Sequence, residues 1–185
     1  MNKILILLTV LTLSCGNTIS KTADVEEIEE NDETTSLQQD ILLGEFTKED
    51  LKQKPYATWF EPRYKEFSPK DEAMVKIQEN IHDYEIKLLM GTWCGDSRRE
   101  LPKFIKLLDK ANYDYDKLEM LAVDHNKTTP SNIEKELDVH HVPTIIFYKD
   151  GKEVNRFVEY PQEESIEEDI AMIVSGEKYK NSYAD

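Results

Sequence analysis

The chain has 185 residues, of which 39% are hydrophobic and 33% charged, so it can bury one hydrophobic core of ordinary size. Asp and Glu number 38 against 23 Lys and Arg, and the formal charge of −15 disfavours contact with a phosphate backbone. We therefore expect no nucleic-acid partner. The chain has two cysteines, and its four histidines lack the spacing of zinc-finger ligands. These counts exclude a zinc ribbon and a disulfide-dense scaffold. We expect neither a metal nor a cofactor.

The first 14 residues have the pattern of an export signal. Lys3 supplies a positive charge, and residues 4–13 form an apolar run too short to span a bilayer of ~30 Å. Residues 11–15, Leu-Thr-Leu-Ser-Cys, resemble the lipobox of bacterial lipoproteins. The resemblance implies that Cys15 becomes a lipidated N-terminus, which would anchor the protein in the cell envelope on a periplasmic or outer-membrane face. A secreted protein with an incidental cysteine in its signal is the alternative.

The next segment, residues 15–41, is expected to form an acidic tether. Seven of the ten residues from 24 to 33 are acidic and show no apolar periodicity, so self-repulsion favours an extended, solvated chain. A calcium loop would need regular oxygen-ligand spacing and a turn glycine, which this segment lacks. We expect a folded domain over residues 42–179, made of an extension (42–85) and a core (86–175), and a tail over residues 180–185.

The extension begins with an aromatic-rich leader over residues 46–67, punctuated by Pro55 and Pro62, which we expect to be helical and to pack on the core. Ser68 and Pro69 then predict the start of an amphipathic helix ending near His82.

The core alternates apolar strands with helical patterns. Strand-like runs cover residues 86–90, 118–123, 144–148 and 153–158, and the last two are joined by Asp150-Gly151, a hairpin signal. Helical spacing follows the first strand, Thr129-Pro130 opens a short helix, and a final helix begins near Gln162 and stops at Gly176. The order β-α-β-α-β-β-α predicts an α/β fold.

Cys94 stands where the first core strand turns into a helix. Unpaired N–H groups and the positive end of a helix favour a thiolate over a thiol, which suits a nucleophile. Arg98 and Arg99 would add to this effect if they turned toward the sulfur, whereas Asp96 and Glu100 would oppose it. Without this setting, a lone cysteine is more often a small buried hydrophobe.

Three separated motifs resemble the thioredoxin superfamily: residues 93–97 (Trp-Cys-Gly-Asp-Ser), the helix proline Pro102, and residues 142–144 (Val-Pro-Thr). The resemblance covers residues 86–175. It implies a three-layer α/β/α fold with a central mixed sheet and an N-terminal helical extension.

The site residues follow from the same resemblance. Cys94 would be the attacking cysteine, in a loop with Trp93, Gly95 and Asp96. Val142, Pro143 and Thr144 would line a groove for an extended substrate polypeptide, with a cis peptide bond before Pro143.

Two positions depart from that family. Ser97 occupies the place of the resolving cysteine, so dithiol chemistry within the site is excluded, because a hydroxyl forms no disulfide. We assign Cys94 and Ser97 together as the catalytic positions. Leu88 replaces a buried carboxylate that handles the proton of the second thiol. His140 and His141 precede the Val-Pro-Thr motif, and we interpret them as surface-loop histidines rather than partners of Cys94.

Three functions remain open for this sequence. A monothiol redox protein would exchange disulfides through Cys94, as an oxidoreductase or isomerase that another thiol releases. A non-catalytic module would hold extended polypeptide in the groove without using Cys94. A structural lipoprotein would use neither the groove nor Cys94. The expected partners are protein thiols and disulfides or extended polypeptide, with the membrane contacted through the N-terminal lipid, and we expect a monomer.

Overall fold

The computed structural model of the protein describes residues 41–184. The expected export signal, Cys15 and nearly all of the acidic tether lie outside the described residues. Within the described part, no helix has the length and apolar character needed to cross a membrane.

A five-stranded mixed sheet forms the centre of the described unit, with strand order β1-β3-β2-β4-β5. The strands are β1 Gly44–Glu45, β2 Glu85–Met90, β3 Leu118–Ala122, β4 Thr144–Lys149 and β5 Lys152–Val158. β2 and β3 are parallel, whereas the other three pairs are antiparallel. This α/β architecture with a central sheet confirms the predicted fold class.

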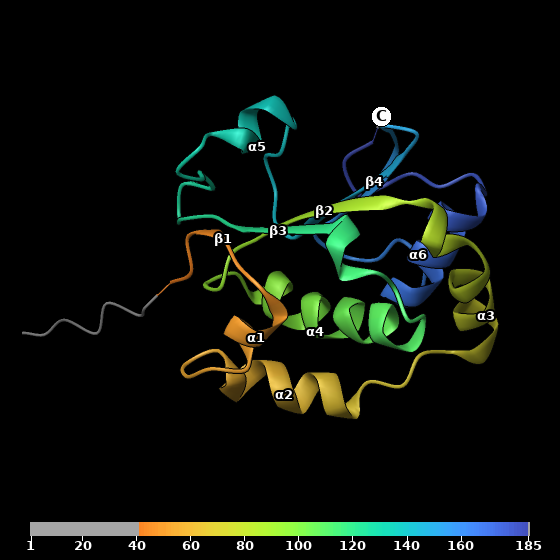
Figure 1. The fold of residues 1–185 in the computed structure, drawn as a ribbon, viewed down its shortest axis with the longest axis horizontal. Helices are drawn as coiled ribbons and strands as arrows, with labels where there is room; N and C mark the ends of the chain where they lie inside the picture. Colours follow the sequence, from red (N-terminus) through yellow and green to blue (C-terminus); the bar gives the residue numbers. More distant parts are fainter. Residues whose placement is uncertain (1–40, 185) are drawn as a thin grey trace, which may run out of the picture. The chain divides into compact units, whose positions relative to one another are not determined.

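The helices cover the two faces of the sheet unequally. Figure 1 shows α2, α3, α4 and α6 on one side of the sheet and the short α5 on the other. The helical segments are α1 Lys48–Leu51, α2 Ala57–Glu66, α3 Asp71–Asn80, η1 Ile81–Asp83, α4 Gly95–Lys110, η2 Tyr115–Lys117, α5 Ile133–Glu136 and α6 Ile166–Ser175. The main core therefore lies between the sheet and the larger helical layer.

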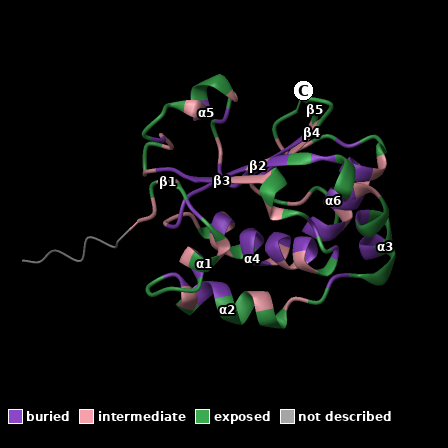
Figure 2. Cartoon of the chain, viewed as in Figure 1, coloured by how far each residue is buried: buried purple, intermediate pink, exposed green. Residues whose placement is uncertain are grey.

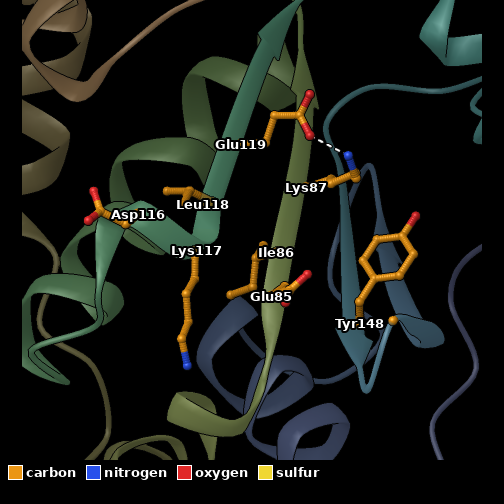
Figure 3. A pocket seen from close by; sticks show the side chains of 9 residues that line it. Glu85, Ile86, Lys87, Asp116, Lys117, Leu118, Glu119 and Tyr148 are labelled. Atoms are coloured by element: carbon orange, nitrogen blue, oxygen red, sulfur yellow. Dashed lines mark hydrogen bonds and ion pairs between the residues drawn. The ribbon is translucent and has the colours of Figure 1, made fainter.

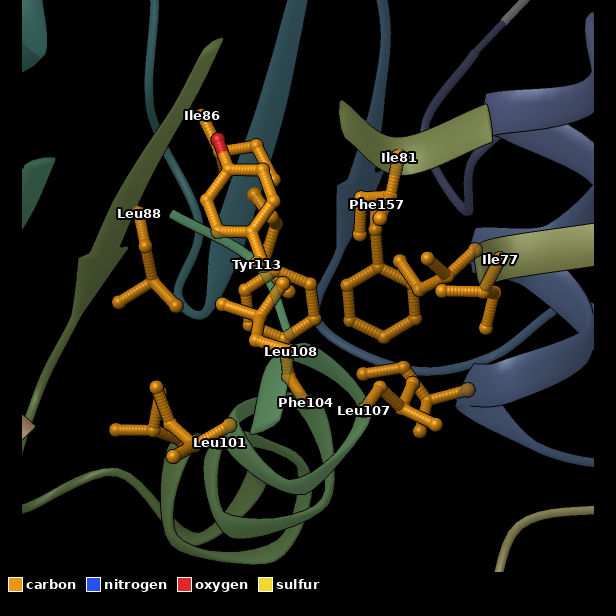
Figure 4. Close-up of a cluster of buried hydrophobic side chains, with 14 of the residues drawn as sticks. Ile77, Ile81, Ile86, Leu88, Leu101, Phe104, Leu107, Leu108, Tyr113 and Phe157 are labelled. Carbon is orange, nitrogen blue, oxygen red and sulfur yellow. The ribbon is translucent and has the colours of Figure 1, made fainter. Parts of the chain in front are cut away.

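Side-chain alternation along β2 divides the hydrophobic residues between the two faces. Leu88 points into the main core with Phe104 of α4 and Phe157 of β5, which Figure 4 shows between the sheet and the helices. Leu89 belongs to a second, smaller cluster with Val142, against which Trp93 and Cys94 pack. Figure 2 shows buried residues concentrated in the sheet and in α4. The second cluster thus supports the loop that carries Cys94.

The predicted hairpin is present, and its turn has the backbone that the dipeptide favours. Asp150 and Gly151 have φ values of 53° and 72°, the left-handed pair typical of a two-residue hairpin turn. Gly176 ends α6 with φ 74°, as expected for a glycine that stops a helix.

Three helices begin later than predicted. α6 starts at Ile166 with Ser165 as its N-cap residue, not near Gln162. The backbone N–H groups of Gln162 and Glu163 donate to the Asp169 carboxylate at 2.8 and 2.9 Å, and these bonds hold the preceding segment as a loop. Similarly, α3 starts at Asp71 after Lys70, rather than after Ser68.

The short helix after β3 also begins later than the sequence predicted. Thr129 does not open α5, because its backbone N–H and its hydroxyl both donate to the Glu134 carboxylate, at 2.9 and 2.6 Å. The helix starts at Ile133, whose N–H donates to the Thr129 hydroxyl at 3.1 Å.

The N-terminal leader is helical, as predicted, and contains α1 and α2, whereas the strand before them was not predicted. The Lys54–Pro55 peptide is cis, between α1 and α2. β1 pairs with β3 through only two residues, too few to show a periodic pattern in the sequence.

Candidate active site

Cys94 is the N-cap residue of α4, directly after the loop that follows β2. Its φ of −77° and ψ of 129° are extended, and its carbonyl accepts the first helical hydrogen bond from the Arg98 N–H at 3.1 Å. The backbone N–H of Cys94 donates to the Gly91 carbonyl at 2.9 Å. The side chain is a half-buried free thiol. The sulfur therefore lies at the positive end of a 16-residue helix.

The Cys94 thiol contacts the loop between α5 and β4. Its S–H donates to the Val142 carbonyl oxygen at 3.1 Å. The Val142–Pro143 peptide bond is cis, and the Pro143 carbonyl accepts from the Glu159 N–H at 2.8 Å. Thr144 is buried and donates its hydroxyl to the His141 carbonyl at 2.7 Å. The structure thus brings together Cys94 and the three residues assigned to the groove.

Trp93 is held by two contacts in the loop before the helix. Its Nε1–H donates to the Val123 carbonyl at 3.1 Å, and its ring lies 5.0 Å from the ring of His125. An added Cβ at Gly91 would lie 2.6 Å from Trp93 Cε2, so only glycine fits beneath the indole. Sequence reasoning missed His125, since nothing in its local pattern marks it.

Ser97 has a structural contact in place of a second thiol. Its side chain is fully buried, and its hydroxyl oxygen accepts from the Gly91 N–H at 3.2 Å. This bond joins the end of β2 to the first turn of α4. Ser97 follows Cys94 by three positions, which puts the two residues on neighbouring positions of one helical turn.

The charged residues of the first turn contact one another or the loop rather than the sulfur. Arg99 pairs with Asp96 at 2.6 Å and with the buried carboxylate of Glu100 at 2.6 Å. Arg98 donates to the Thr92 carbonyl. Both guanidinium groups thus have other partners, and the condition under which an arginine would stabilise the Cys94 thiolate is not met. At Gly95 an added Cβ would meet no atom within 4 Å, so the helix start beside Cys94 is open.

The histidines before the cis-proline contact carboxylates. His140 Nε2 lies 2.9 Å from Asp138 Oδ1, and His141 Nδ1 lies 3.3 Å from Glu159 Oε1. Among residues 41–184, neither imidazole is hydrogen-bonded to Cys94, in agreement with the interpretation of these two residues as loop histidines. No group of three or more potential metal-ligand side chains converges in this described part of the chain.

A hollow of about 390 Å³ lies away from this site, at the beginning of β2 and β3 (Figure 3). Cys94, by contrast, follows the end of β2. An ion pair between Lys87 and Glu119 crosses the two strands at the hollow, and Tyr148 of β4 lines its other side. The hollow is not lined by a cysteine, and Cys94 is the free thiol among the described residues.

Comparison with known proteins gives one consistent result. The family profile described as Thioredoxin matches residues 61–172. The thioredoxin of Gallus gallus is 29% identical over 112 residues, which are 55% of this chain and 100% of that protein. The thioredoxin of Staphylococcus haemolyticus is 32% identical over 105 residues, 52% of this chain and 93% of that protein. The structure of Fasciola hepatica thioredoxin is 30% identical with a TM-score of 0.32, over 44% of this chain and 73% of that one.

Proposed function

The chain belongs to the thioredoxin family, and on this premise we propose that it exchanges disulfides with protein substrates through the single thiol of Cys94, while lipid-anchored in the cell envelope. One observation carries the redox proposal: the Cys94 sulfur lies at the start of α4 and 3.1 Å from the carbonyl that precedes the cis-proline. This places a nucleophile directly beside backbone groups that an extended polypeptide can bind.

The first chemical step is attack on a substrate disulfide. Cys94 loses its proton to solvent, and the thiolate, stabilised by the amides of the first helical turn, attacks one substrate sulfur. A bond forms between the Cys94 sulfur and that sulfur. The substrate's original S–S bond breaks, and its other sulfur leaves as a thiolate with the electron pair. The product is a mixed disulfide between the protein and its substrate.

Loss of the Cys94 proton also changes the groove. In the thiol form, the Val142 carbonyl accepts the S–H bond. A thiolate has no proton to donate, so this carbonyl becomes available to a backbone N–H of the substrate.

Release of the substrate requires a thiol from outside the site. The buried Ser97 hydroxyl is engaged with Gly91 and cannot form an S–S bond. A second cysteine of the substrate, or a small thiol, attacks the mixed disulfide, and Cys94 leaves as a thiolate. When the substrate supplies this thiol from a different position, the net reaction is isomerisation of its disulfide.

Capture of mixed disulfides tests the redox proposal. Without an added thiol, the wild-type protein should form long-lived disulfide adducts with envelope polypeptides, which mass spectrometry would locate at Cys94. Cys94→Ser is the matched control and should form none. If Cys94→Ser retains the same polypeptides as the wild type, the protein is a polypeptide-binding module and the redox proposal is wrong.

Restoring the second thiol is the complementary test. Ser97→Cys puts a buried thiol one helical turn from Cys94 and should confer reduction of insulin disulfides with a dithiol donor, which the wild type should lack. Adding Leu88→Asp should raise that rate further, because it supplies a buried carboxylate to take up a proton. If the new pair forms its disulfide and neither variant reduces insulin, the remainder of the site is not redox-competent.

Envelope anchoring rests on the lipobox-like sequence ending at Cys15. Cys15→Ser should move the protein from the membrane fraction to the soluble fraction, and labelling with a radioactive fatty acid should disappear. A Cys15→Ser protein that stays in the membrane fraction would contradict the lipid anchor without affecting the proposal for Cys94.

A further inference from the structure

The C-terminal segment 181–184 lies against the residues that flank the cis-proline. The Tyr183 ring stacks on His141 at 3.8 Å between centroids, with 15° between the planes. The Ser182 hydroxyl donates to the Val158 carbonyl at 2.9 Å and receives a hydrogen bond from Gln162 Nε2 at 2.9 Å. This segment is thus attached to the residues before the cis-proline and to those after β5.

Tyr183 and Glu159 form a pair at this position. The Tyr183 hydroxyl donates to Glu159 Oε2, while Oε1 of the same carboxylate faces His141. The hydrogen bond to Glu159 is the largest of the causes that raise the pKa of Tyr183 to about 12. The phenol therefore stays neutral and remains a donor at physiological pH.

The ion-pair partner of Glu159 is a histidine, His141 at 3.3 Å, rather than a lysine or an arginine. Asp96 is paired with Arg99, and Glu153 binds Arg156 through both oxygens, at 2.6 and 2.7 Å. Among the described residues, no Lys or Arg forms an ion pair with Glu159. Its backbone φ of 59° is also unusual for a residue with a side chain, and such positions concentrate at functional sites.

The space beside this pair can take a side chain. A hollow of about 250 Å³ is lined by His141, Tyr183 and Val158, with Arg156 as the cation on its wall. Arg156 is paired with Glu153, and the lining carboxylate Asp138 faces His140. Glu159 lies beside the hollow through its contacts with the lining residues His141 and Tyr183. Tyr183 is 48% exposed, which leaves part of its ring open to a ligand.

We propose that Tyr183 and Glu159 form a subsite for a basic side chain of the polypeptide that Cys94 attacks. The subsite specifies the substrate class of the proposed function and rests on it. A lysine or arginine places its cation against the carboxylate and the tyrosine ring, and its aliphatic stem against Val158. Polypeptides with a basic residue near the reactive disulfide are therefore the preferred substrates.

The test uses a set of matched peptides with the full-length protein in mild detergent. Cys15→Ser makes Cys94 its single thiol, since the chain has two cysteines. Each alanine-based peptide carries one cysteine as a mixed disulfide with thionitrobenzoate, and a Lys, Gln or Glu two residues away, on either side in turn. When Cys94 bonds to the peptide sulfur, coloured thionitrobenzoate leaves with the electron pair of the broken bond.

The expected result is a charge preference that depends on both subsite residues. The Lys peptide should react about threefold faster than the Gln peptide, the change that an exposed ion pair of ordinary strength gives, and the Glu peptide should react more slowly than both. The preference should vanish at about 1 M salt, where charges are screened beyond about 3 Å. Glu159→Gln and Tyr183→Ala should each reduce it, and Glu163→Gln, a surface carboxylate between α3 and α6, should leave it intact.

Each rate is divided by the rate of the same protein with neutral dithiodipyridine, which reports attack by Cys94 alone. Equal rates with the three peptides in the wild type would overturn the subsite and leave the redox proposal standing. A chain ending at Lys180 that reacts faster with every peptide, whatever its charge, would also overturn it, because the C-terminal segment would then be a cover. No reaction with dithiodipyridine or any peptide would refute the redox function itself.

Discussion

Replacing Ser97 by alanine measures what the serine contributes where a second cysteine is expected. The Ser97 hydroxyl is the hydrogen-bond acceptor of the Gly91 N–H, and both residues are buried. Alanine fits the space but leaves this N–H without an acceptor, at a cost of about 1–3 kcal/mol. The N···O distance of 3.2 Å is at the long end of the usual range, which favours the lower half of that interval.

The expected effect is measurable by thermal unfolding. A destabilisation of about 1–2 kcal/mol corresponds to a Tm decrease of about 2–8 °C for a protein of this size. Ser131→Ala is the matched control, since this exposed hydroxyl lies 3.3 Å from Thr129 Oγ1 and shields no buried donor. We expect its Tm to change by less than about 1–2 °C, as for most surface substitutions. If the two variants have the same Tm, Ser97 does not join β2 to α4 energetically and the argument from the buried N–H is wrong.

Three further changes test the packing around the site and the fold. Gly91→Ala puts a Cβ 2.6 Å from the Trp93 ring, so it should displace the indole, shift its fluorescence and destabilise the protein by about 1–3 kcal/mol. Burial opposes ionisation of Asp109, but hydrogen bonds from Lys48, Tyr64 and others outweigh it and lower the pKa of Asp109. Ionised Asp109 therefore stabilises the folded protein above the unfolded pKa of about 4, and this stabilisation is lost as the pH falls through the lower folded pKa. Asp109→Asn should lower the Tm at pH 7 and should make the Tm fall less steeply as the pH is lowered. Gly176→Ala forces a side chain into a left-handed conformation and should cost about 1 kcal/mol in urea unfolding, whereas an unchanged midpoint would contradict this.

The sequence was sufficient for the elements whose signals are local. Apolar runs and helical spacing identified the four core strands and α4, because alternation and 3.6-residue periodicity are properties of consecutive residues. The hairpin turn at Asp150 and Gly151 could be predicted for the same reason, since the two residues themselves favour that backbone. The substitution of Ser97 for a second thiol was likewise evident without a structure.

Helix starts were less predictable, because carboxylates five to seven residues further along the chain accept hydrogen bonds from the backbone N–H groups of the predicted first turn. Asp169 lies within α6 and accepts from Gln162 and Glu163, which turns the predicted first helical residues into a loop. The carboxylate of Glu134 has the same effect at Thr129. Capping residues read from the sequence therefore located these helices within a few residues of their observed starts.

For this protein, the sequence by itself determined the kind of nucleophile, its position before a helix and the loss of its dithiol partner. Only the tertiary structure decided what surrounds that nucleophile. The contacts of Cys94 with Val142, of Trp93 with His125, and of Tyr183 with His141 join segments that are far apart in the chain. The first two exist because the sheet order puts β2 between β3 and β4, which brings the loops after β2 and β3 and before β4 to one edge of the sheet. No periodicity within a single segment encodes that adjacency.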